Sequence, residues 1–306
     1  MPRLLKSARL AAIGGGAATV GYWTVLLSEV MVARRVIGTT DERPPRADGV
    51  YGVDLGGTPV RLLVLGDSAA VGYGMQRADL TPPALLGIGL SHVLGQPVDV
   101  RSQAVVGAQT HDLREQVNIG IEHRPDLVLI IIGANDVTHR VPSYVSSRLL
   151  SATVKRLRDS GAEVVVGTCP DLGTVRPIPQ PLRWVARRKS RSLARRQTIA
   201  TVREGGRAVS LGGLLGPVFA EMADIMFGED RFHPSATGYA NMVSVLVPSL
   251  AASWRERHRD YAVPHSLGHQ DTMSLVEAAE RAGRRDGTEV TPEGRWATTI
   301  LRRRRA

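Results

Sequence analysis

Short apolar runs alternate with longer amphipathic stretches between residues 59 and 254. We predict buried strands at 60–65, 98–100, 127–132, 163–167 and 208–211. We predict helices at 82–94, 110–123, 142–160, 181–204, 214–227 and 235–254. This alternation is typical of an α/β fold with a central parallel sheet, here of about five strands, and helices on both faces. Such sheets hold their functional groups at the carboxyl ends of the strands.

The start of the chain departs from this pattern. Arg3, Lys6 and Arg9 precede a mostly apolar stretch at 10–33 that Ser28 and Glu29 interrupt. A basic start before an apolar segment is typical of a signal peptide or a membrane anchor, and a membrane span needs about 20 apolar residues. We assign 1–38 to such a segment and expect an exported protein, held at the cell envelope or secreted. The alternative is a helix that packs on the domain or lies on a membrane surface, with the chain staying inside the cell.

Two further segments flank the predicted domain at 59–254. Residues 39–58 are rich in Pro, Gly and Asp, a composition that predicts a linker. Residues 255–306 are polar and end in four arginines at 302–305. We predict that this segment is a mostly flexible, basic tail with one short helix at 273–282.

The net charge adds a question about partners. The 306 residues carry a formal net charge of +10, which favours contact with anionic surfaces. Much of it lies at 176–207, where Glu204 is the single acid and Trp184 contributes to a partial apolar side. One interpretation is a solvated helix face; the other is a helix that binds an anionic membrane surface through the region from Arg183 to Arg196. We expect no nucleic-acid partner, because no nucleic-acid-binding module accompanies the charge.

Chemically useful residues follow several predicted strands. Ser68 comes directly after the first strand, in VLGDSAAVGYG at 64–74, and Gly107 follows the second. Asn135 follows the third strand in LIIIGAND, and Asp230 lies three residues before His233, ahead of the last helix. A serine after a strand is weak evidence alone, since serine is a common helix N-cap. Together, these residues occur in order at the ends of predicted strands and ahead of the last predicted helix, and this arrangement indicates a functional site.

The four sequence segments that contain Ser68, Gly107, Asn135 and His233 resemble the four conserved blocks of the SGNH hydrolase superfamily, also called GDSL esterases and lipases. The resemblance covers about residues 59–254 and implies a flavodoxin-like three-layer α/β/α sandwich. It implies a catalytic triad of Ser68, His233 and Asp230. It also implies an oxyanion hole formed by the backbone N–H of Ser68, the backbone N–H of Gly107 and the side-chain amide of Asn135.

Two positions depart from the pattern of the superfamily. Ala69 stands where leucine is usual, and Ser102 stands where asparagine is common. We interpret Asp67 and Asp136, which flank site residues, as structural hydrogen-bond acceptors for turns. Cys169 is the only cysteine, and we expect a buried or half-buried structural thiol rather than a nucleophile.

The residue types suit the implied chemistry. A serine hydroxyl becomes a nucleophile when a base removes its proton, and an imidazole titrates near neutral pH. The implied function is a serine esterase or lipase that hydrolyses carboxylic esters, acyl or acetyl, through an acyl-enzyme. Polysaccharide deacetylation and thioester hydrolysis use the same triad, and a non-catalytic membrane-tethered binding protein is the alternative from another class. No residues have metal-ligand spacing, so we expect neither a metal nor another cofactor. We expect the proline-rich loop at 169–181 to form the pocket rim and influence acyl-chain length.

Overall fold

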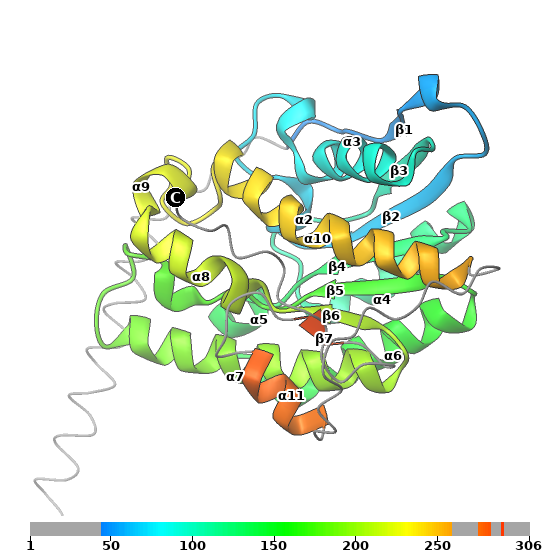
Figure 1. The fold of residues 1–306 in the computed structure, drawn as a ribbon. Coiled ribbons are helices and arrows are strands. Elements are labelled where there is room, and N and C mark those ends of the chain that lie inside the picture. Colours follow the sequence, from blue (N-terminus) through cyan, green and yellow to red (C-terminus); the bar gives the residue numbers. More distant parts are fainter. Residues whose placement is uncertain (1–43, 259–274, 283–288, 291–306) are drawn as a thin grey trace, which may run out of the picture.

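The structure is a computed structural model that describes residues 44–258, 275–282 and 289–290. Its centre is a sheet of seven strands in the spatial order β1-β3-β2-β4-β5-β6-β7 (Figure 1). The strands are β1 Gly49–Tyr51, β2 Val60–Gly66, β3 Val98–Ser102, β4 Leu127–Ile131, β5 Glu163–Gly167, β6 Arg207–Val209 and β7 Glu289–Val290. Strands β2 to β6 are parallel, and β1 and β7 add antiparallel edges on β3 and β6.

The parallel strands have the order of a flavodoxin-like fold. Numbered among themselves, β3-β2-β4-β5-β6 follow the order 2-1-3-4-5, so the winding direction reverses at β2. The predicted α/β fold with a parallel sheet of about five strands is confirmed. A doubly wound sheet opens a crevice at this reversal, beyond the carboxyl ends of the central strands.

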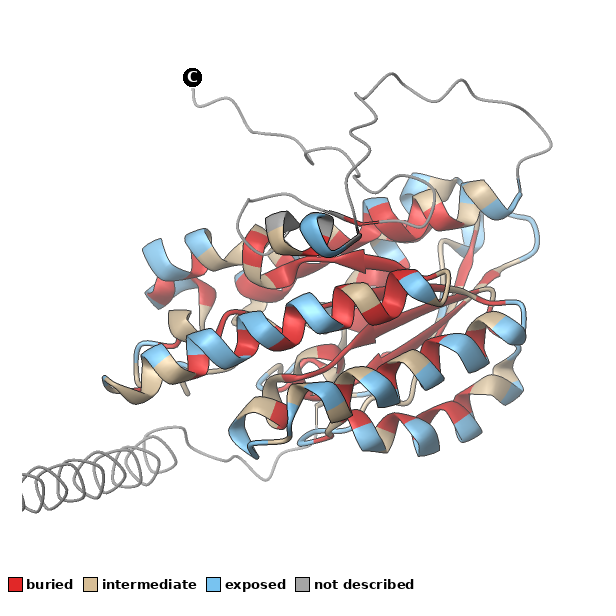
Figure 2. Ribbon diagram, turned by 90° about the horizontal axis from the view of Figure 1, so that it is seen from below, coloured by how far each residue is buried: buried red, intermediate tan, exposed pale blue. Residues whose placement is uncertain are grey.

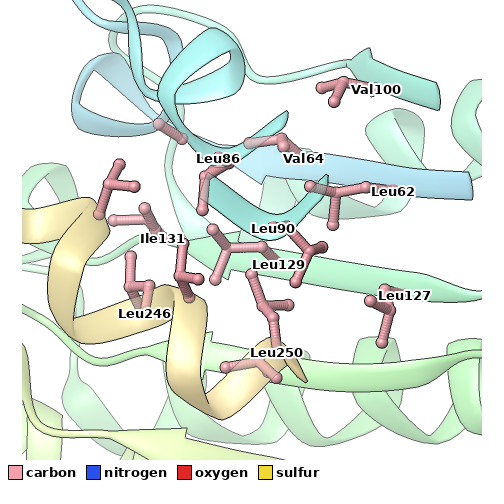
Figure 3. Packing of buried hydrophobic residues seen from close by; sticks show 14 of the residues in the cluster. Leu62, Val64, Leu86, Leu90, Val100, Leu127, Leu129, Ile131, Leu246 and Leu250 are labelled. Atoms are coloured by element: carbon pink, nitrogen blue, oxygen red, sulfur yellow. The ribbon is translucent and has the colours of Figure 1, made fainter. Parts of the chain in front are cut away.

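Helices cover both faces of the sheet. They are α2 Ser68–Val71, α3 Pro82–Leu94, α4 Leu113–Gly120, α5 Ala134–Thr138, α6 Ser143–Asp159, α7 Leu182–Arg203, α8 Leu211–Glu221, α9 Ala223–Met226, α10 Ala236–Arg257 and α11 Leu275–Ala282. Helices α3 and α10 pack on one face, where Leu86, Leu90, Leu246 and Leu250 meet the alternate residues of β2 and β4 (Figure 3).

The opposite face is covered by α4 and α6. Leu63 and Leu65 of β2 point there and pack against Val117 of α4 and Leu150 of α6. Because successive strand residues point to opposite faces, β2 and β4 are buried on both sides, which explains their nearly continuous apolar runs. Figure 2 shows red strands between helices whose outer faces are blue.

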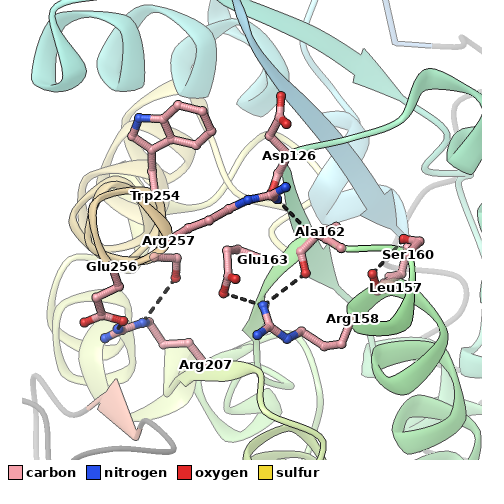
Figure 4. Close-up of polar contacts among 12 residues, drawn as sticks. Asp126, Leu157, Arg158, Ser160, Ala162, Glu163, Arg207, Trp254, Glu256 and Arg257 are labelled. Carbon is pink, nitrogen blue, oxygen red and sulfur yellow. Dashed lines mark hydrogen bonds and ion pairs between the residues drawn. The ribbon is translucent and has the colours of Figure 1, made fainter. Parts of the chain in front are cut away.

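Polar contacts join α10 to the amino end of the sheet, opposite the functional crevice (Figure 4). Arg207 at the start of β6 donates to Ser253 Oγ at 3.2 Å and to Glu256 Oε2 at 2.5 Å. The Arg207 side chain is 8% exposed and that of Glu256 is 35% exposed, so only the arginine end of this ion pair is shielded from water. Arg257 donates to the carbonyl oxygens of Asp126 and Gly161.

The linker and tail predictions are wrong at two places. Within the predicted linker 39–58, Gly49–Tyr51 form β1, whose backbone pairs with β3 and whose Tyr51 ring packs against Gly87 of α3. Within the predicted tail 255–306, Glu289–Val290 pair with β6, and Val290 is fully buried. Pro- and Gly-rich composition does not show that a neighbouring strand edge can accept a short strand.

The short tail helix is confirmed as α11, which contacts α7 through an Arg195–Glu280 ion pair of 2.9 Å. The predicted N-terminal segment at 1–38 and the four arginines at 302–305 lie outside the described residues. None of the helices in the described ranges combines the length and apolar character needed to cross a bilayer.

Candidate active site

Ser68 lies at the first position of α2, immediately after β2. Gly66 makes this sharp turn, because its φ is +138° and a Cβ there would come within 1.9 Å of the Ile131 carbonyl oxygen. Asp67 caps the helix, and its Oδ1 accepts a hydrogen bond from the Ala69 N–H at 3.0 Å. The turn therefore presents Ser68 at the carboxyl end of β2. The structural role predicted for Asp67 is confirmed.

A buried glutamine holds this turn from the neighbouring helix. Gln116 of α4 accepts the Gly66 N–H at 2.8 Å and donates to the Gly66 carbonyl oxygen at 2.9 Å. One side chain that is 4% exposed thus bonds both backbone groups of Gly66, and the carbonyl oxygen also accepts the Val105 N–H at 3.1 Å. Nothing in the local sequence around Gln116 signals this contact, and the sequence analysis missed it.

His233 and Asp230 lie opposite Ser68 in the loop before α10. His233 Nε2 is 3.0 Å from Ser68 Oγ, and His233 Nδ1 is 2.6 Å from Asp230 Oδ2. The other oxygen of Asp230 accepts the backbone N–H groups of Phe232 and His233, each at 2.9 Å. The structure thus brings together the three residues named from the sequence, although Ser68 and His233 are 165 positions apart.

The surroundings favour the charged form of Asp230. Burial by itself raises the pKa of Asp230, but the hydrogen bonds from the His233 ring and from the two backbone N–H groups outweigh it, so the pKa lies below its ordinary value. Tyr73 and Phe232 flank the His233 ring, with ring centroids 4.4 Å and 5.0 Å away. The imidazole is therefore held by an anion on one side and by aromatic rings around it.

Asp67 is a second carboxyl near the same histidine. Its residue is 2% exposed, and burial raises the pKa of Asp67 to about 7. The Ala69 N–H and the nearby His233 act in the opposite direction, but they compensate only part of the lost hydration. Asp230, rather than Asp67, makes the hydrogen bond to the His233 ring.

Asn135 and Gly107 come from adjacent turns. Asn135 Nδ2 donates to the carbonyl oxygen of Ala108 at 3.0 Å, which joins the turn after β4 to the loop after β3. Gly107 is exposed, and its φ is +82°, a backbone conformation that favours glycine. The structure therefore explains glycine at this position by its backbone conformation. Asp136 accepts from the Thr110 N–H at 3.1 Å and from Ser146 Oγ at 2.7 Å, which confirms the structural role predicted for it.

A second glutamine supports the ends of β4 and β5. Gln197 of α7 accepts the Cys169 N–H at 2.7 Å and donates to the Ile132 carbonyl oxygen at 2.9 Å. Cys169 is a buried free thiol, and burial raises its pKa well above the ordinary value. The structural thiol predicted from the sequence is confirmed.

An apolar cavity of about 80 Å³ lies beside Ser68 and His233. Residues from the loop after β5, from α8 and from the segment between α9 and α10 line it, among them Leu172, Val175, Leu215, Phe219, Phe227 and Phe232. The loop after β5 is fixed to α7 through Asp171, whose side chain is 4% exposed and pairs with Arg187 at 3.4 Å and Arg191 at 3.0 Å. The predicted contribution of this proline-rich loop to the pocket is confirmed.

These ion pairs change the picture of the basic helix. Arg187, Arg191 and Arg195 of α7 have acidic partners, whereas the ring of Trp184 is 55% exposed and lies 5.7 Å from the Arg188 guanidinium. Part of the positive charge between Arg183 and Arg196 therefore stabilises the fold around the cavity. No group of three or more potential metal ligands occurs within the described ranges.

Known proteins share both the sequence and the fold. A family model described as "GDSL-like Lipase/Acylhydrolase family" matches residues 64–240. A GDSL-like esterase from Mycobacterium tuberculosis is 40% identical over 255 residues, which span 79% of this chain and 81% of the relative. An arylesterase from Vibrio mimicus is 39% identical over 107 residues, 35% of this chain and 52% of the relative.

Solved structures agree on the architecture. A protein named TesA superposes with a TM-score of 0.50 at 21% identity, covering 63% of this chain and 99% of its own. An acetyl-xylooligosaccharide esterase from Geobacillus superposes with a TM-score of 0.51 at 19% identity, covering 65% of this chain and 97% of its own. At these identities the likeness concerns the fold.

Proposed function

The chain belongs to the GDSL-like lipase/acylhydrolase family, and on this premise we propose that it is a serine esterase with a Ser68-His233-Asp230 triad. The esterase-named relatives support ester hydrolysis. They favour an enzyme over the alternative of a non-catalytic binding protein on the same fold. The observation that supports the triad is that the His233 ring contacts both other members. Its Nε2 is 3.0 Å from Ser68 Oγ, and its Nδ1 is 2.6 Å from Asp230 Oδ2.

The first half of the reaction follows from these contacts. With its Nδ1–H donated to Asp230, the neutral His233 ring has an unprotonated Nε2 that accepts the Ser68 proton. Ser68 Oγ attacks the ester carbonyl carbon, and the charge of Asp230 stabilises the imidazolium that forms. His233 then returns the proton to the departing alcohol, which leaves an acyl group on Ser68. Water hydrolyses this acyl-enzyme by the same sequence of proton transfers.

The oxyanion of each tetrahedral intermediate needs donors already in place. We assign this role to the backbone N–H groups of Ser68 and Gly107 and to Asn135 Nδ2. Ser68 starts a helix, where backbone N–H groups have no intrahelical acceptor. Asn135 Nδ2 uses one N–H for Ala108, and its second N–H is assigned to the substrate oxygen.

The proposal is tested with a fluorophosphonate probe and p-nitrophenyl esters. We expect stoichiometric labelling and turnover of the wild type, and loss of both in Ser68→Ala. Ser147→Ala is the matched control, because Ser147 is half-buried on α6 and its hydroxyl donates locally to the Tyr144 carbonyl oxygen. Turnover by Ser68→Ala at the wild-type rate would contradict the proposal. An acetylated glycan and an acyl thioester in the substrate set separate deacetylase and thioesterase activity from carboxylesterase activity.

We also propose that the enzyme is exported and works at the cell envelope, where part of its basic surface contacts anionic lipid. The support is the basic start followed by the apolar stretch at 10–33. Cell fractionation is expected to place the protein in the envelope or the medium. Recovery of the full-length chain in the cytoplasm would contradict export.

A further inference from the structure

Phe227, at the end of α9, separates two cavities. The apolar cavity of about 80 Å³ beside Ser68 lies on one side of it. A more open groove of about 650 Å³ lies on the other side, lined by charged residues that include Arg176, Asp224, Glu229 and Arg231. Among the described residues, Phe227 is the one that lines both. Phe227 therefore lies in the wall between an apolar compartment and a polar one.

The wall is held firmly in place. The Phe227 ring packs edge-on against Phe219 of α8, with centroids 5.1 Å apart and planes at 85°. It also packs with Leu172 and Val175 of the loop after β5, each 3% exposed. Its backbone N–H donates to the Ala223 carbonyl oxygen at 3.0 Å, and Phe227 forms a bridge to Pro234, next to His233. Contacts on several sides oppose displacement of the ring by a substrate.

The size of the inner cavity limits what can occupy it. Its volume of about 80 Å³ is roughly half that of an apolar cavity of about 150 Å³ that binds benzene, a ring of six carbons. On this scale the cavity holds about two to four carbons of an acyl chain. A longer chain would meet the Phe227 ring.

We propose that Phe227 is the residue that limits acyl-chain length and that the enzyme acts on short-chain esters, from acetyl to about butyryl. This inference rests on the proposed function, because the cavity receives an acyl chain only if Ser68 is the nucleophile. Removal of the ring joins the cavity to the groove behind it. A longer acyl chain then passes the former wall, and its end reaches the wider groove.

The test is the kcat/KM of a series of p-nitrophenyl esters from acetate to decanoate. We expect the wild type to decline steeply beyond butyrate. In Phe227→Ala, the ratio of octanoate to butyrate kcat/KM is expected to rise about tenfold or more, since single methylenes in an apolar pocket change such ratios by about this factor. Ile225→Ala is the matched control, because Ile225 lies two residues before Phe227, is 52% exposed and lines neither cavity.

Phe227→Leu, a smaller change in a packed cluster, is expected to shift the profile in the same direction if Phe227→Ala does not fold. A wild-type preference for octanoate or longer esters would overturn the inference, and this measurement needs no variant. An unchanged octanoate-to-butyrate ratio in a folded Phe227 variant would also overturn it. Failure of the proposed function looks different: the wild type would then hydrolyse no ester, or Ser68→Ala would remain active.

Discussion

Asp67 and Asp230 show how the same residue type acquires different properties near one histidine. Asp230 receives three hydrogen bonds, and these hold its pKa below the ordinary value against the effect of burial. Asp67 is almost fully buried, and burial raises its pKa to about 7. Near neutral pH, Asp230 is therefore the anion that orients His233, whereas Asp67 is partly protonated.

The raised pKa of Asp67 predicts a pH-dependent cost in stability. Its folded-state pKa of about 7 lies above the ordinary value of 3.8, so the folded protein binds this proton more tightly than the unfolded chain. Stability from this group is therefore present at low pH and is lost as the pH rises from about 4 to about 7. Asp67→Asn keeps an acceptor for the Ala69 N–H and removes the ionisation.

Urea denaturation of both proteins at pH 5 and pH 8 measures this cost. The quantity compared is the free energy of unfolding of Asp67→Asn minus that of the wild type. We expect this difference to be about 2–3 kcal/mol larger at pH 8 than at pH 5. Asp54→Asn, at an exposed position, is the control. A difference between variant and wild type that does not change with pH would show that burial of Asp67 carries no such cost.

At the scale of elements, the prediction succeeded where local signals mark both ends. Helix α3 occupies the predicted range because Pro82 stands in its first turn and Gly95 ends it with a φ of +69°. The predicted strand at 208–211 ends early, since Ser210 caps α8 by accepting the Gly213 N–H. The predicted helix at 214–227 begins at Leu211 and is interrupted at Met222, whose ψ of 40° is not helical. Capping chemistry, rather than apolar periodicity, set these boundaries.

The joint between β2 and α4 is a contact between elements that can be tested directly. Gln116→Leu leaves the N–H of Gly66 buried without its partner, whereas the carbonyl oxygen keeps the hydrogen bond from the Val105 N–H. Because an unsatisfied buried group costs about 1–3 kcal/mol, we expect a loss of about 1–3 kcal/mol in the free energy of unfolding. We also expect a lower kcat with little change in KM, since Gly66 lies two residues before Ser68.

Asn118→Leu is the control for this prediction, because Asn118 is exposed on the same helix. Chemical denaturation gives the stability, and ester hydrolysis gives kcat and KM. Stability equal to the wild type in Gln116→Leu would mean that other groups take over the hydrogen bonds of Gly66.

At the scale of the whole molecule, segments from outside the predicted domain complete the sheet. Strand β1 covers the edge of β3, and β7 covers the edge of β6. Exposed strand edges offer unpaired N–H and carbonyl groups to other chains, so covering them also protects against association through the edges. The predicted domain at 59–254 is therefore shorter than the unit that folds together.

The net charge of +10 also belongs to this scale. Arg188, which lies near the exposed ring of Trp184, has no acidic partner among the described ion pairs, in contrast to Arg187, Arg191 and Arg195. We expect the full chain to bind vesicles containing phosphatidylglycerol more tightly than vesicles of phosphatidylcholine. Trp184→Ala/Arg188→Ala is expected to weaken binding to the anionic vesicles about fivefold or more, because a basic residue near such a surface contributes about 1 kcal/mol.

Vesicle co-sedimentation over a range of lipid concentrations measures this effect. Arg114→Ala, at an exposed position on α4, is the control for loss of charge. The segment at 1–38 is common to all variants, so ratios between variants isolate the contribution of α7. Equal binding of the double variant and the wild type would favour the interpretation of a solvated helix face.

The sequence by itself determined the five parallel strands, most of the helices and the residues of the proposed triad. These features have local causes. Apolar runs, helix-end residues and short motifs at strand ends each consist of residues that lie within a few positions of one another in the sequence. Only the tertiary structure decided that Gln116 holds Gly66, that Gln197 joins the turns after β4 and β5, and that Phe227 lines both cavities. Gln116 lies 50 positions from Gly66, and contacts between such distant residues leave no pattern along the chain because they depend on how the elements pack.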